Sequence, residues 1–170
     1  MLGPSERATA NPVHRGLPVP TSPLIGRGPD VNMIRMQLLH PDIRLLTLTG
    51  PAGVGKTRLA VAAAVLEHFA NGAVFVNLAP IPDPTLVLAR IAEVVGVLPA
   101  GDQPLIACLS AALREEQRLL IVDNCEHVLA AGAELASLLA ACPALKILAT
   151  SRAPLRLRGE HELPVPPLND

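Results

Sequence analysis

A run of eight residues, GPAGVGKT at positions 50–57, constrains this chain of 170 residues more than any other part of its sequence. The run follows the apolar stretch RLLTLT and precedes RLAVAAAVL, which is apolar after its first residue. The spacing of Gly50, Gly55, Lys56 and Thr57 fits the pattern G-x-x-x-x-G-K-[S/T], in which a glycine-rich turn joins a strand to a helix N-terminus. The run therefore predicts an α/β fold with a phosphate-binding turn at the carboxyl end of a strand.

Each part of this turn has a chemical task. Glycines allow backbone N–H groups to point at phosphate oxygens, and the helix N-terminus adds a partial positive charge. Lys56 is expected to reach the β- and γ-phosphates of a nucleotide, and the Thr57 hydroxyl to ligate Mg²⁺. A tight turn that carries a lysine by chance is the alternative. The expected nucleotide contacts are Gly50, Pro51, Ala52, Gly53, Val54, Gly55, Lys56, Thr57 and Arg58.

The stretch LLIVD places Asp123 at the carboxyl end of a second buried strand. An unpaired carboxylate is costly to bury there, and a Mg²⁺ ion shared with Thr57 would explain it. An aspartate that only caps the next helix is the alternative. Glu126, three residues further on, is a candidate for orienting an attacking water, although a glutamate in the first turn of a helix also compensates the helix dipole.

The stretch ILATSR ends another predicted strand with Arg152. Ligands of parallel sheets bind beyond the carboxyl ends of the strands, so Arg152 is expected to approach a γ-phosphate and to report its presence. A solvent-facing arginine is the alternative. The candidate catalytic residues are therefore Lys56, Asp123, Arg152 and Glu126, and the candidate metal ligands are Thr57 and Asp123.

Strands alternate with helices along the rest of the chain, which predicts a parallel sheet. Strands are expected at 44–49, 73–78, 118–123, 144–151 and 161–168. Helices are expected at 30–39 with Asp30 as N-cap, at 56–70, from Asp83 to Leu98, at 104–116, and after Asn124 as far as Cys142. The proline-rich and polar residues 1–20 are expected to be a flexible leader, and residues 21–170 to be one domain.

Composition excludes several classes of protein. The net charge is −1, which gives no basis for binding nucleic acid through its phosphates. The cysteines Cys108, Cys125 and Cys142 form no CxxC pair, so we expect reduced, buried thiols in a cytoplasmic protein. The longest purely apolar run, 59–66, is far shorter than the roughly 20 residues of a membrane span.

Taken in order, the stretches LIGR, LLTLTGPAGVGKTRLA, VFVNLAPIPDP, LLIVDNCEHVL, ILATSRAPL and GEHELPVPPL resemble the nucleotide-binding domain of STAND-class P-loop ATPases of the NB-ARC type. The version in bacterial transcriptional regulators of the LuxR and AfsR kinds is the most similar. The resemblance covers roughly residues 18–168. It implies a P-loop NTPase fold, an α/β three-layer sandwich with a five-stranded parallel sheet in the order 5-1-4-3-2.

The resemblance also implies an ATP/ADP switch with Mg²⁺ as cofactor, and other protein domains or further copies of the chain as partners. Its upstream motif, which maps onto Ile25, Gly26 and Arg27, contacts the adenine side of the nucleotide, and its sensor arginine maps onto Arg152. The acidic residue that usually follows this motif is replaced here, since the chain reads GRGPD. The helical and winged-helix domains of the family have no counterpart in the sequence, so an isolated core or a fragment is expected.

Three functions remain open from the sequence. The first is an ATP-binding switch with slow hydrolysis, because DNCEH is usual in the bacterial branch. The second is a module that does not hydrolyse ATP and serves as an ADP-bound scaffold, because Asn124 stands where many relatives carry a second aspartate. The third is a small-molecule kinase, for which the chain offers few charged or aromatic groups to bind an acceptor.

Overall fold

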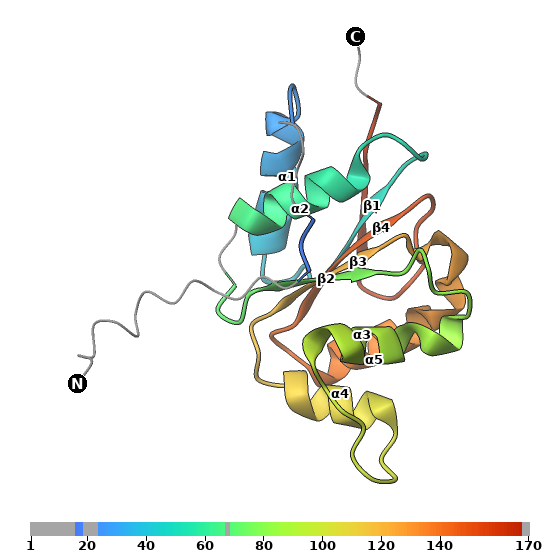
Figure 1. Cartoon of the computed structure of the whole chain (residues 1–170). Helices are drawn as coiled ribbons and strands as arrows, with labels where there is room; N and C mark the ends of the chain where they lie inside the picture. Colours follow the sequence, from blue (N-terminus) through green and yellow to red (C-terminus); the bar gives the residue numbers. More distant parts are fainter. Residues whose placement is uncertain (1–15, 19–23, 67–68, 168–170) are drawn as a thin grey trace, which may run out of the picture.

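The computed structural model describes residues 16–18, 24–66 and 69–167. Its centre is a five-stranded sheet in the order β2-β3-β4-β1-β5, and each neighbouring pair of strands is parallel. Read from the other edge this is 5-1-4-3-2, so the predicted order is confirmed (Figure 1). The strands are β1 (Leu45–Thr49), β2 (Ala73–Asn77), β3 (Leu119–Asp123), β4 (Lys146–Ser151) and β5 (Glu160–Pro164).

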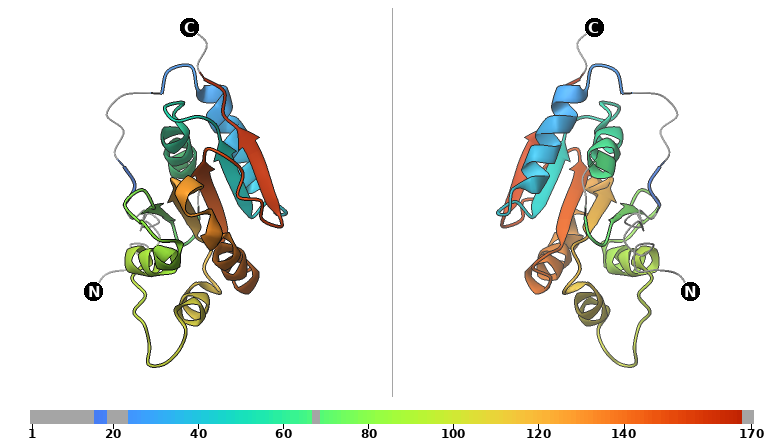
Figure 2. Two further views of the ribbon diagram at one scale, coloured as in Figure 1. Left: turned by 90° about the vertical axis from the view of Figure 1, so that its right-hand side faces the viewer. Right: turned by 90° about the vertical axis from the view of Figure 1, so that its left-hand side faces the viewer.

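Helices cover both faces of the sheet, which makes the predicted three-layer sandwich (Figures 1 and 2). On one face lie α1 (Gly28–Leu39) and α2 (Lys56–Leu66), which pack against each other. On the other lie α3 (Val87–Val95), α4 (Leu105–Leu113) and α5 (Gly132–Ala141). Because both faces are covered, all five residues of β1 and of β3 are buried, and their sequences are nearly continuous apolar runs.

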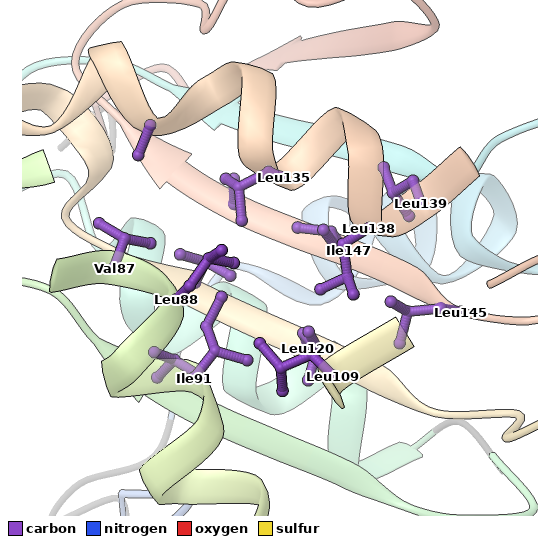
Figure 3. Close-up of a cluster of buried hydrophobic side chains, with 14 of the residues drawn as sticks. Val87, Leu88, Ile91, Leu109, Leu120, Leu135, Leu138, Leu139, Leu145 and Ile147 are labelled. Carbon is purple, nitrogen blue, oxygen red and sulfur yellow. The ribbon is translucent and has the colours of Figure 1, made fainter. Parts of the chain in front are cut away.

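The pleat of the strands divides the apolar core into two clusters. Leu46, Leu48 and Ile121 point toward α1 and α2. Leu45, Leu120 and Ile147 point toward α3, α4 and α5, where Leu109, Leu135 and Leu138 meet them (Figure 3). Successive side chains of a strand alternate between faces, so one set of strands serves both clusters.

Two predicted helix starts differ from the structure. The first helix begins at Gly28 with Pro29 in its first turn, and Asp30 lies inside the helix instead of capping it. Proline suits this position because its missing N–H would have no partner inside the helix. The predicted helix after Asn124 is wrong over its first turns, since 3-10 turns span Cys125–His127 and Leu129–Ala131 and the α-helix begins only at Gly132.

Helix ends differ as well. Asp83 acts as a cap as predicted, because its Oδ1 accepts a hydrogen bond from the Thr85 N–H at 2.9 Å, but it caps the 3-10 turn Pro84–Leu86, and α3 begins only at Val87. α3 ends at Val95, and Gly96 follows in the left-handed conformation with φ 79°. Leu98, predicted on the apolar face, is 84% exposed. The helix predicted over 56–70 is described as far as Leu66, and Ala70 lies in a turn.

Of the expected leader, residues 16–18 are described, and Leu17 packs against the cluster under α1 and α2. The remaining residues of that prediction lie outside the described ranges. Over 16–18, 24–66 and 69–167, no helix has the length and apolar character needed to cross a membrane.

Candidate functional site

The loop between β1 and α2 has the backbone that its glycines predict. Gly50, Gly53 and Gly55 have φ angles of 150°, 84° and 91°, which favour glycine. At Gly50 the space is also closed, because a Cβ would lie 2.9 Å from the carbonyl oxygen of Val165. The last turn of the loop leads into the N-terminus of α2, where the Leu59 N–H donates to the Gly55 carbonyl at 3.0 Å.

A pocket of about 290 Å³ opens over this loop. Three segments far apart in the sequence line it: the loop with the start of α2, the residues after β3, and the end of β4. The lining residues are Ala52, Gly53, Gly55, Lys56, Thr57, Arg58, Asn124, Glu126, Thr150 and Arg152. Six of the nine nucleotide contacts predicted at 50–58 therefore share one pocket with the predicted sensor Arg152, whereas Gly50, Pro51 and Val54 are not among its lining residues.

Lys56 lies at this pocket with its ammonium group turned toward the loop. Its Nζ donates to the carbonyl oxygens of Gly50 at 2.7 Å and Pro51 at 2.9 Å. Partial burial lowers the pKa of Lys56, and the neighbouring Arg152 adds to this, while the carboxylates of Glu126 and Asp123 oppose it. A lysine beside a helix N-terminus gives the pocket the positive potential that phosphate oxygens require.

Asp123 is 4% exposed, as predicted for the end of a buried strand, but its carboxylate is not unpaired. Its Oδ1 accepts hydrogen bonds from the hydroxyls of Thr57 at 2.7 Å and Thr150 at 2.6 Å. Its Oδ2 accepts one from the Asn124 amide at 2.9 Å. The buried carboxylate thus has three neutral hydrogen-bond donors instead of being unpaired, and the predicted closeness of Asp123 and Thr57 is present.

The donor set still fits a magnesium ion. Mg²⁺ prefers hard oxygen ligands and is usually held by one or two protein groups together with phosphate oxygens and water. Thr57 Oγ1 and Asp123 Oδ1 are such oxygens, 2.7 Å apart, and Thr57 lines the pocket. In the described part of the chain, no group of three or more His, Cys, Asp or Glu side chains could hold a metal by itself. A magnesium site here would therefore depend on the phosphates of a bound nucleotide.

The structure adds two polar groups around Asp123 whose contacts the sequence analysis missed. Thr150 donates to Asp123 and also accepts a hydrogen bond from the Asn124 backbone N–H at 3.0 Å. Asn77, at the end of β2, lies next to Asp123 in the sheet register, and its side-chain oxygen accepts from the Asn124 amide at 3.4 Å. The sequence does indicate these contacts in one way, because Thr150 and Asn77 are polar residues at the carboxyl ends of parallel strands.

Asn124 has the left-handed conformation, with φ 63° and ψ 55°, which asparagine tolerates better than most residues. Its side-chain amide donates hydrogen bonds to Asp123 and Asn77, so Asn124 does not cap the following turn. This explains why the chain turns sharply after β3 instead of entering a helix at once.

Arg152 and Glu126 form an ion pair in the pocket, with 3.8 Å between Arg152 Nε and Glu126 Oε1. Arg152 is exposed, with 64% of its side-chain surface accessible, whereas Glu126 is mostly covered. The other carboxylate oxygen of Glu126, Oε2, is buried and makes no hydrogen bond with the described residues. The pocket thus contains an exposed arginine and a carboxylate oxygen that has no hydrogen-bond partner among the described residues.

Cys125 directly precedes Glu126 in the sequence but is not reactive. It is buried, and burial raises the pKa of its thiol to about 12, with the nearby carboxylates of Glu126 and Asp123 adding to the effect. A thiol with so high a pKa carries almost no thiolate near neutral pH and is a poor nucleophile. Cys108 and Cys142 are also free and buried, as the sequence predicts.

The upstream residues lie apart from the pocket lining. Ile25 is 79% exposed, while Arg27 is 3% exposed and directs its guanidinium toward oxygens of the protein. Contact between Ile25 or Arg27 and a nucleotide stays a prediction.

Comparison with known proteins agrees with this site. The sequence profile described as "AAA domain" matches residues 42–164. A protein of Mycobacterium tuberculosis that carries the name of an HTH-type transcriptional regulator is 42% identical over 135 residues, which are 79% of this chain and 15% of that protein. An uncharacterized protein of the same species is 37% identical over 148 residues, which are 85% of this chain and 37% of that protein. The chain thus spans well under half the length of these relatives.

Solved structures with the same fold are more distant in sequence. Cdc6p from Pyrobaculum aerophilum matches 80% of this chain and 41% of its own, with a TM-score of 0.59 and 19% identity. A STAND protein with a tetratricopeptide repeat sensor from Pyrococcus horikoshii matches 90% of this chain and 25% of its own, with a TM-score of 0.59 and 16% identity. These likenesses show the fold.

The profile match covers more than half of the chain and includes the loop, the end of β3 and the end of β4. Together with the pocket at the carboxyl edge of the sheet, it shows that this chain belongs to the AAA domain family of P-loop ATPases.

Proposed function

We propose that this domain is a Mg²⁺-dependent ATP/ADP switch with slow ATP hydrolysis, working in the cytoplasm within a larger signal-transducing regulator. The observation that carries the proposal is the convergence of Lys56, Glu126 and Arg152 on one pocket beside the Thr57–Asp123 pair. The Mycobacterium tuberculosis relative that is named as an HTH-type transcriptional regulator, and is much longer than this chain, supports the link to regulation. Other domains or further copies of the chain would then be its partners.

Each residue has a part in this proposal. Lys56 and the N-terminus of α2 bind the β- and γ-phosphates, and Arg152 binds the γ-phosphate when it is present. Thr57 and Asp123 would hold Mg²⁺, which supplies charge neutralisation on the phosphate oxygens. Glu126, whose Oε2 has no hydrogen-bond partner among the described residues, orients a water molecule for attack on the γ-phosphorus.

Slow turnover follows from the same contacts. Asn124 is neutral, and its amide is already bonded to Asp123 and Asn77, so it cannot take a proton from water. Among the described residues, Glu126 supplies the one carboxylate of the pocket lining, and its Oε1 is held in the ion pair with Arg152. Glu126 is therefore held away from an attacking water until Arg152 moves toward a γ-phosphate.

That ion pair also supports a second candidate, a domain that binds ADP and ATP without hydrolysis. The two candidates differ in the release of radiolabelled phosphate from ATP by the purified chain with Mg²⁺. We expect turnover below about 1 s⁻¹, at the slow end of the enzyme range, and its loss when EDTA removes the metal. A Lys56→Ala sample prepared in the same way measures contaminating ATPase. Binding of ATP with no phosphate release above that sample would select the second candidate.

Arg152→Ala should weaken binding of a non-hydrolysable ATP analogue by about tenfold, the loss of one charge-assisted contact to the γ-phosphate. ADP affinity should change by less than about twofold, because the lost contact involves only the third phosphate. Isothermal titration with both nucleotides measures the two ratios. Arg158→Ala, a change of an exposed arginine in the same β4–β5 connection, is the matched control. Equal losses of affinity for the ATP analogue and for ADP would contradict a sensor role for Arg152.

A further inference from the structure

Arg27 is an arginine buried beneath the phosphate-binding loop. It is 3% exposed and lies just before α1. A charged group so deep is costly to bury unless its donors find partners, and the planar fork of arginine suits several oxygens at once. Its Nη1 donates to Asp30 Oδ2 at 2.9 Å and to the Pro166 carbonyl at 3.0 Å, and its Nη2 donates to the Val54 carbonyl at 2.8 Å.

The contact with Val54 reaches the loop from the side away from the pocket. Residues 52, 53 and 55–58 line the pocket, and Val54 is not among the lining residues. The Val54 side chain packs instead against the apolar cluster under α1 and α2. Arg27 therefore supports the backbone of the loop from behind without facing the space where phosphates would lie.

The contact with Pro166 joins the same guanidinium to the backbone that leaves β5. In the views of Figure 2 this backbone runs beside the start of α1. A second link lies at the other end of the loop, where the Val165 N–H donates to the Thr49 carbonyl at 2.7 Å. A Cβ on Gly50 would also touch the Val165 carbonyl oxygen. The exit from β5 is thus joined to the loop directly near Gly50 and through Arg27 at Val54.

We propose that Arg27 is a positioning residue that couples the shape of the phosphate-binding loop to the backbone leaving β5. The proposal rests on the proposed nucleotide binding, because a bound phosphate is what orders the loop. When the Val54 carbonyl moves, the rigid guanidinium of Arg27 either loses one of its hydrogen bonds or moves together with the Pro166 carbonyl. The presence of a bound nucleotide thereby affects a backbone segment outside the pocket.

The Val165 amide is the reporter for this coupling, since Pro164, Pro166 and Pro167 have no N–H. In the full chain, saturating Mg-ADP should slow hydrogen exchange at Val165 by about threefold or more, measured by NMR, as the local opening of this segment becomes rarer. In Arg27→Lys, a single ammonium cannot bridge Val54 and Pro166 as the fork does. Mg-ADP should then still slow exchange at Gly53 and Gly55 but leave Val165 within about 1.5-fold of its free rate.

Asp30→Asn is the matched control, because it removes the ion pair of Arg27 and leaves both carbonyl contacts possible. The response of Val165 to Mg-ADP should persist in this variant. A wild-type response that survives in Arg27→Lys would overturn the proposal. If Arg27→Lys does not fold, the wild-type protein provides the test. If calorimetry shows that it binds Mg-ADP but the exchange rate of the Val165 amide does not change, the coupling alone is contradicted. If the wild-type chain does not bind Mg-ADP, both the proposed function and the coupling are contradicted.

Discussion

Lys56→Ala should lower the affinity of the domain for Mg-ADP and Mg-ATP by about 100-fold or more, the loss of charge-assisted contacts to two phosphates in a partly buried pocket. The Lys56 ammonium lies beside the loop, bonded to the carbonyls of Gly50 and Pro51. Those carbonyls can be solvated by water when the ammonium is removed, so the variant should keep its fold. Calorimetric titration with each nucleotide measures the effect.

Two companion variants separate the local role of Lys56 from its charge. Arg114→Ala removes an exposed positive charge at the end of α4 and should leave both affinities unchanged within about twofold. Lys56→Arg keeps the charge but cannot reproduce a compact ammonium in the loop, so it should recover little of the lost affinity. Wild-type affinity in Lys56→Ala would contradict a phosphate-binding role for the loop, whatever the turnover assay shows.

Leu148→Ala should reduce the free energy of unfolding by about 3 kcal/mol, within the range for truncating a fully buried leucine. Leu148 is 0% exposed and belongs to the cluster under α1 and α2. It lies in β4, between β3 and β1, so the strands on both sides limit how far the cavity can collapse. Domains have about 5–15 kcal/mol of stability in total, so this one change should remove a large share of it.

Urea denaturation followed by circular dichroism measures this loss, with an unchanged m-value as the sign that the folded state keeps its compactness. Leu98→Ala is the matched control, because the same truncation at an 84% exposed side chain should cost less than about 0.5 kcal/mol. A loss below about 1 kcal/mol at Leu148 would show that the cluster under α1 and α2 repacks.

The site residues that could be predicted from the sequence are those that belong to a short motif or that end or follow a predicted strand. The loop glycines, Lys56 and Thr57 are adjacent in the chain, and Asp123 and Arg152 end or follow apolar runs that are easily recognised as buried strands. Because parallel strands present their carboxyl ends at one edge, their meeting in one pocket followed from topology. The strand order itself came from the resemblance to a family and not from any local pattern.

Contacts between distant polar groups could not be predicted in this way. Arg27 and Pro166 are 139 residues apart, and nothing in the local sequence of either residue encodes the other. The left-handed Asn124 is a similar case. Its sequence context suits a helix cap, but the hydrogen bonds with Asp123 and Asn77 outweigh the local preference. Leu98 continues an apolar pattern, yet the left-handed Gly96 ends the helix before reaching it.

The strand β5 lies at an edge of the sheet and pairs with β1 on one side only. Two of its glutamates turn back over the sheet, where Glu160 accepts a hydrogen bond from the Thr47 hydroxyl and Glu162 accepts one from the Thr49 hydroxyl. Charged residues turned over the sheet and a proline are features that make an edge a poor template for another strand. Pro164 is the proline of this edge, so β5 is a poor template for a strand of another sheet and does not promote sheet-to-sheet aggregation.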